Sequence, residues 1–95
     1  MSDFDARMAQ LRARFLDRAA AERAQLVEAM AADDAAEIRR IAHSLSGAGG
    51  VFGFPAISAS AQQVEETLDG PPDPAALDRL CRALLDALDA VLQAP

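Results

Sequence analysis

The single histidine of the chain, His43, is the residue best suited to carry out chemistry. An imidazole that is open to solvent keeps a large neutral fraction near pH 7, and its free ring nitrogen can act as a nucleophile or exchange a proton. A lone histidine is, however, more often an inert, hydrogen-bonded part of a core. The direction in which His43 points therefore decides whether it is available for reaction.

Helical geometry predicts that His43 points away from the core. Apolar or small residues recur around it at helical spacing, namely Ile38, Ile41, Ala42, Leu45, Gly49 and Phe52. At about 100° per residue, they fall within roughly 60° of one direction. His43 lies about 140° from Ile38 on the same helix, nearly opposite this stripe. We therefore expect the imidazole on the solvent side.

The neighbours of this imidazole are cationic, hydroxylic or without a side chain. Arg39 lies one turn before it and Gly47 one turn after it, which places both beside it on the helix surface. Ser46 and Gly50 flank the same strip, and Arg40 lies at its edge. The sequence thus surrounds the histidine with two guanidinium groups, a hydroxyl and bare backbone.

Glycines are frequent in this segment although they weaken a helix. Gly47, Gly49 and Gly50 lie within it and Gly53 at its end, and each internal glycine costs about 0.5–1 kcal/mol relative to alanine. One interpretation is that the missing side chains let another surface reach the histidine; the other is that the helix frays into a loop. The continuing apolar period favours the helix. A nucleotide-binding loop is disfavoured, because no Gly-Lys-Ser/Thr follows.

The sequence predicts four amphipathic helices, which together position this strip. The first opens at Ser2 or Asp3, ends near Ala32, and begins with a stripe of Phe4, Met8, Leu11 and Phe15. Arg18 and Glu22 interrupt the stripe, which leaves room for a kink or break between residues 18 and 22.

Three further helices follow after short connections. Asp33 or Asp34 caps the second, which runs to Gly53, and Phe54-Pro55 opens the third, with Ile57, Ala61, Val64 and Leu68 as its stripe. After the turn at residues 69–72, Asp73-Pro74 opens the fourth, with Leu77, Leu80, Cys81, Leu84, Leu88 and Val91. We predict an all-α fold, an antiparallel up-and-down four-helix bundle.

Length and composition indicate one domain over residues 1–95. The formal net charge of −6 disfavours nucleic acid and anionic membrane as partners. We find neither a signal peptide nor an apolar run of about 20 residues, so we expect a cytoplasmic protein. The one cysteine, Cys81, excludes an internal disulfide and lies on the apolar stripe of the fourth helix.

Residues 42–53, Ala-His-Ser-Leu-Ser-Gly-Ala-Gly-Gly-Val-Phe-Gly, resemble the signature of histidine-containing phosphotransfer (HPt) domains. That pattern is roughly Ala-His-x-Leu-Lys-Gly, a run of small residues, then an apolar residue and glycine. The resemblance is specific over this segment and generic over the rest of the four-helix plan. It implies that His43 accepts a phosphoryl group from a receiver-domain aspartate and donates it to another.

The resemblance also implies roles for the surrounding residues. Glu65, on the next helix, would accept a hydrogen bond from one ring nitrogen. Arg40 and Ser44 are candidates for contact with the partner, because they lie along the strip around His43. The family lysine is replaced here by Ser46, which brings no charge, so Arg39 would supply a fork suited to phosphate.

The partner implied is a response-regulator receiver domain, a hybrid histidine kinase, or both. We expect no metal site and no cofactor in this chain, since the metal and most of the catalytic machinery would belong to the receiver. The chain would then be a monomeric phosphocarrier rather than an enzyme.

Two alternatives stay open. The first is a helical adaptor that binds a kinase or receiver domain without being phosphorylated. The replacement of the family lysine by Ser46 supports this alternative. The second is a structural bundle that self-associates through its helix stripes. A monomer that buries all its stripes would leave no apolar seam for such assembly.

Overall fold

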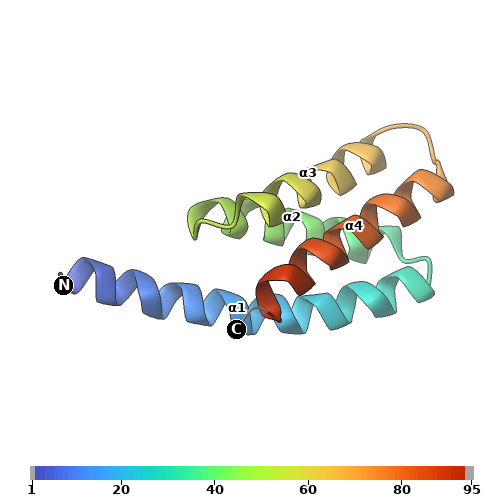
Figure 1. Cartoon of the computed structure of the whole chain (residues 1–95). Helices are drawn as coiled ribbons and strands as arrows, with labels where there is room; N and C mark the ends of the chain where they lie inside the picture. Colours follow the sequence, from blue (N-terminus) through green and yellow to red (C-terminus); the bar gives the residue numbers. More distant parts are fainter. Residues whose placement is uncertain (1, 94–95) are drawn as a thin grey trace.

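A computed structural model describes residues 2–93 and consists of four helices joined by short turns (Figure 1). They are α1 (Asp3–Ala31), α2 (Ala35–Val51), α3 (Pro55–Asp69) and α4 (Pro74–Leu92), and no strand occurs among the described residues. Each helix packs against the next, and α4 returns to pack against α1. The predicted all-α four-helix bundle is therefore confirmed.

The helix ends follow the capping signals of the sequence. The hydroxyl of Ser2 and the carboxylates of Asp34 and Asp73 each accept a hydrogen bond from a backbone N–H of the first turn that they precede. Phe54 makes no such bond, and α3 begins instead with Pro55, which has no N–H to satisfy. The glycines at 47, 49 and 50 lie inside α2, so the helical interpretation of that segment is confirmed.

The break considered between residues 18 and 22 is absent, because α1 is one continuous helix. Glu22 does not interrupt the buried stripe but belongs to it, between Ala19 and Leu26. The hydroxyl of Ser44 on α2 donates a hydrogen bond to its carboxylate over 2.9 Å. A buried polar group that finds such a partner is tolerated in a core, so the helix continues.

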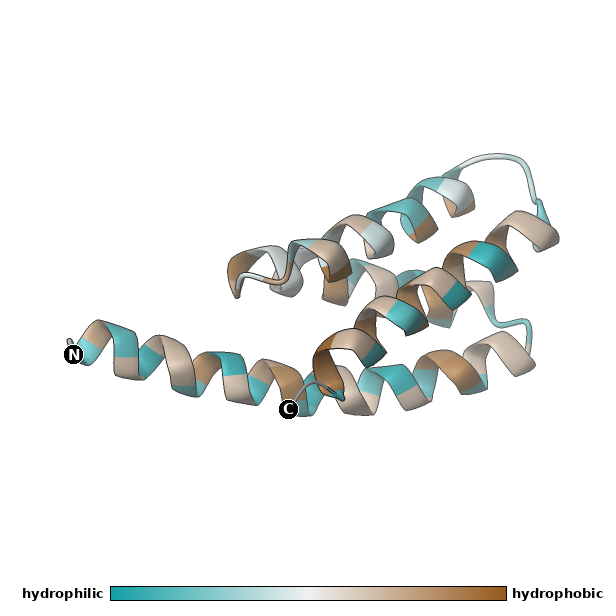
Figure 2. Ribbon diagram, in the orientation of Figure 1, coloured by the Kyte–Doolittle hydropathy of each residue, from teal (hydrophilic) through white to brown (hydrophobic). Residues whose placement is uncertain are grey.

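The core lies along the bundle axis and is built from one face of each helix. Brown and teal segments alternate along the helices in Figure 2, as expected for helices with one apolar face. The buried apolar residues are Phe15, Ala19, Leu26, Ala29, Ile38, Ile41, Ala42, Leu45, Ile57, Ala61, Val64, Cys81, Leu84 and Leu88. Within residues 2–93, no helix has both the length and the apolar composition to cross a membrane.

The second helix packs closely against the start of the third at Gly49. A Cβ atom at this position would lie only 3.2 Å from the backbone nitrogen of Ser58 and 3.4 Å from the carbonyl oxygen of Phe54. The N–H of Phe54 donates to the carbonyl of Gly49 over 2.8 Å. The Ser58 hydroxyl donates to the carbonyl of Ser46 over 2.7 Å. These contacts fix α3 against the half of α2 that follows His43.

We predict that Gly49→Ala is less stable than Gly47→Ala by about 1–3 kcal/mol, the usual cost of overpacking. Both substitutions gain the same helix propensity, but a Cβ at Gly47 meets nothing within 4 Å. Urea denaturation of the two variants measures the difference. Equal free energies of unfolding would show that Gly49 is not required by the packing of α2 on α3.

Candidate functional site

His43 stands on the outer face of α2, with 82% of its side chain exposed. The outward direction expected from helical spacing is confirmed. Ile41 and Ala42, which precede it in the chain, are fully buried. Because the opposite face of α2 is buried in the core, the imidazole is placed on the surface of the bundle.

One ring nitrogen of His43 is engaged by the third helix. Nδ1 lies 3.1 Å from Oε2 of Glu65, whose side chain is 23% exposed. An ionised carboxylate only accepts hydrogen bonds. In the neutral ring, Nδ1 therefore carries the proton, and its N–H donates a hydrogen bond to Glu65. Nε2 then keeps its lone pair and faces solvent. The structure thus brings together the two residues that the sequence had placed on neighbouring helices.

Arg39 is directed along the bundle toward the end of α3. Its Nη1 donates to Oδ1 of Asp69 over 2.7 Å, and both side chains are exposed. The structure therefore pairs this guanidinium with Asp69 and does not leave it as an unpaired cation beside His43. An exposed ion pair of this kind contributes about 0–1 kcal/mol, so it can be exchanged for another anion at low cost.

Two exposed positions of α2 on the C-terminal side of His43, Gly47 and Gly50, carry no side chain. A Cβ atom at Gly47 would meet nothing within 4 Å, and one at Gly50 would make only an ordinary contact with the Ser58 hydroxyl. Packing inside the chain therefore does not explain why these two positions lack a side chain. Ser46 lies half-buried next to Gly47 and contributes its carbonyl to the contact with α3.

Arg40 and Ser44 lie on the other side of the strip, toward α1. Arg40 bonds to Glu37 through Nε and Nη2 and to Gln25 of α1 over 3.0 Å. The hydrogen bonds between Glu37 and Arg40 lower the pKa of the carboxyl and raise that of the guanidinium. Ser44, proposed as a partner contact, is engaged inside the protein by Glu22.

A polar network between α1 and α2 was not anticipated from the sequence. The Ser44 hydroxyl donates to Oε1 of Glu22 over 2.9 Å and accepts a bond from Nη2 of Arg18 over 3.2 Å. Only 8% of the Glu22 side chain is exposed, and its Oε2 has no hydrogen-bond partner. The signal that could have found it is the position of Glu22 on the apolar stripe, which demands a polar partner on the facing helix.

The family model of the Hpt domain matches residues 10–94, which is most of the chain. The chain belongs to the Hpt domain family. Such domains carry out histidine phosphotransfer in phosphorelays of two-component signalling, with receiver domains and histidine kinases as partners, and are phosphocarriers rather than enzymes in general. No curated protein and no solved structure matches this chain.

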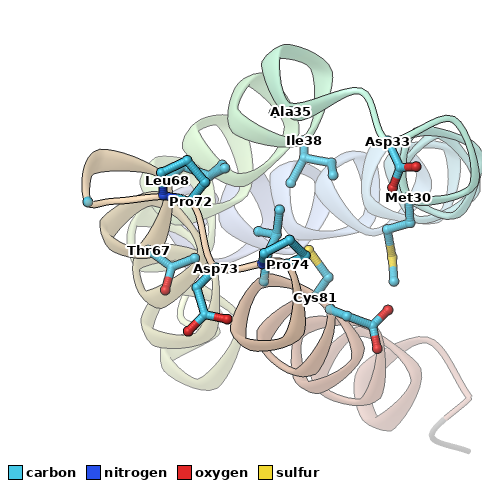
Figure 3. Close-up of a pocket in the computed structure, with 13 residues that line it drawn as sticks. Met30, Asp33, Ala35, Ile38, Thr67, Leu68, Pro72, Asp73, Pro74 and Cys81 are labelled. Atoms are coloured by element: carbon cyan, nitrogen blue, oxygen red, sulfur yellow. The ribbon is translucent and has the colours of Figure 1, made fainter.

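A pocket of about 520 Å³ in this Hpt domain lies away from His43, where the α1–α2 and α3–α4 turns meet (Figure 3). Ile38, Leu77 and Cys81 are among its lining residues. Burial raises the pKa of the Cys81 thiol to about 11, so the reactive thiolate is scarce near neutral pH. Residues 2–93 contain no group of three or more His, Cys, Asp or Glu side chains that could hold a metal ion.

We predict that Ser44→Ala lowers the free energy of unfolding by about 1–3 kcal/mol, because it leaves the buried Glu22 carboxylate without its hydroxyl donor. The double variant Ser44→Ala/Glu22→Met should recover this loss, since an apolar side chain needs no donor. Urea denaturation provides both values. A loss in Ser44→Ala that persists unchanged in the double variant would contradict the role given to the hydrogen bond.

Proposed function

We propose that this protein is the phosphocarrier of a phosphorelay and that His43 takes the phosphoryl group on Nε2. The single observation that carries the proposal is the exposed imidazole whose Nδ1 is held by Glu65 over 3.1 Å. The donor and acceptor would be aspartates of receiver domains, either of a free response regulator or within a hybrid histidine kinase. Membership of the Hpt domain family supports this assignment.

In the proposed step, the Nε2 lone pair attacks the phosphorus of a receiver aspartyl phosphate in line with the bond to be broken. The Nε2–P bond forms, the P–O bond breaks, and its electron pair returns to the aspartate carboxylate. The ring becomes cationic while Nδ1 keeps its proton. The Glu65 carboxylate then faces a positive ring, which stabilises the product. The reverse transfer uses the same atoms in the opposite order.

The negative charge of the phosphoryl group calls for a cation at the site. Ser46 can donate a hydrogen bond but brings no charge, so we assign the guanidinium of Arg39, one turn before His43 on α2, to this role. Its exposed pair with Asp69 is weak enough to be exchanged for a phosphoryl oxygen. The remaining compensation would come from the receiver, which has to approach closely for transfer in any case.

We place the receiver on the exposed backbone at Gly47 and Gly50. Transfer requires the aspartyl phosphate to reach Nε2 directly, and side chains at these positions would stand between the two proteins. A small contact is sufficient for a transient signalling complex. Each chain carries its own complete site, so this function needs one copy only.

We predict that incubation with a 32P-phosphorylated receiver domain labels this protein and that the label is acid-labile and alkali-stable. His43→Gln should abolish the label, because no other histidine is present. The control is Glu66→Gln, which alters an exposed carboxylate next to Glu65 and should label like the parent protein. Binding of the receiver without any label in the parent protein would overturn the proposal and support the adaptor alternative.

A further inference from the structure

About three turns at the start of α1 extend beyond the rest of the bundle (the blue end in Figure 1). We call residues 3–14 the arm. Its apolar face carries Phe4, which is 69% exposed, together with Met8 and Leu11. None of these three belongs to the hydrophobic residues that pack against the core. The same face becomes buried from Phe15 onward.

The bundle ends where the arm begins. The Phe15 ring stacks on Phe54 at a centroid distance of 5.3 Å and meets Phe52 at 5.7 Å, so the α2–α3 turn covers α1 at this point. The fourth helix stops earlier on α1, since Asp89, near its end, pairs with Arg23 over 2.6 Å. The monomer expected from the sequence assumed that every helix stripe is buried, and the arm is an exception.

The charges beside this apolar face differ in sign along the arm. At about 100° per residue, Asp3, Arg7 and Arg14 fall on one flank of the face, and Asp5 and Arg12 fall on the other. All five side chains are exposed, and within the described part of the chain none forms an ion pair. On both flanks the acidic residue comes first: Arg12 follows Asp5 by about two turns, and Arg7 and Arg14 follow Asp3 by about one and about three turns.

This pattern favours an antiparallel pairing with a second copy over a parallel one. With the two Met8 side chains at a two-fold axis, Phe4 of each copy lies near Leu11 of the other. The same register places Asp5 opposite Arg12 and Asp3 opposite Arg14, which gives four favourable pairs, and brings the two Arg7 side chains near each other beside the axis, which gives one unfavourable pair. A parallel pairing would set Asp3 against Asp5 and Arg14 against Arg12, which is unfavourable, and only Arg7 would face an acidic residue, Asp5.

We propose that the arm is a homodimerisation surface on which a second copy of this chain binds antiparallel, apolar face to apolar face. Such a pairing is isologous, as in most two-fold dimers. Twelve helical residues span about 18 Å, and three large apolar side chains per copy bury less than the roughly 1,200 Å² of a stable interface. The dimer is therefore weak and depends on concentration. The proposal does not rest on phosphotransfer at His43.

Sedimentation equilibrium over micromolar to millimolar concentrations tests the proposal. We expect reversible dimerisation of the parent protein. Met8→Glu, which places two carboxylates at the two-fold axis, should raise the dissociation constant at least about tenfold. Val27→Glu is the matched control, because Val27 is an exposed apolar residue of α1 outside the arm and should not affect association. Circular dichroism establishes that each variant keeps its helices.

Charge exchange distinguishes the antiparallel pairing from any other use of the arm. Asp5→Arg and Arg12→Asp should each weaken self-association, since each places like charges opposite one another. Their equimolar mixture should associate more tightly than either variant alone, because the heterodimer restores both pairs. A parent protein that stays monomeric at all concentrations, a Met8→Glu variant that dimerises like the parent, or a mixture no tighter than its components would each overturn the proposal.

Discussion

The hydrogen bond between Nδ1 of His43 and the carboxylate of Glu65 is the interaction on which the account depends. It couples α2 to α3 at the surface and decides which ring nitrogen is free. The same two helices pack backbone to backbone at Gly49, further along α2. The hydrogen bond at the surface thus joins two helices that are also in contact in the interior.

The opposite side of His43 is fixed by a second polar contact. Ser44, the next residue, ties α2 to α1 through the buried carboxylate of Glu22. Hydrogen bonds therefore join α2 to both neighbouring helices at this point: His43 bonds to Glu65 of α3, and Ser44 bonds to Glu22 of α1. The ring of His43 stays exposed, and the positions without side chains follow it along α2. This combination gives an imidazole that is hydrogen-bonded through one nitrogen and yet exposed to solvent.

Much of this arrangement could be predicted from the sequence, because it follows from helical periodicity and capping. The outward direction of His43, the caps at Ser2 and Asp34 and the burial of Cys81 are properties of single helices. The partners of Arg39 and Ser44 depend on distances between helices, which periodicity does not determine. The continuity of α1 stayed open in the sequence for the same reason, since the partner of Glu22 lies on another helix. The unburied arm could not be foreseen without knowing where α4 and the α2–α3 turn end.

The nitrogen that carries the phosphoryl group provides the most direct test of this account. Long-range 1H–15N correlation NMR of the 15N-labelled protein, phosphorylated by a receiver domain, identifies it without ambiguity because the chain has one histidine. We expect the phosphoryl group on Nε2 and a protonated Nδ1. A phosphoryl group on Nδ1 would mean that Glu65 does not hold that nitrogen in solution, and would contradict the account.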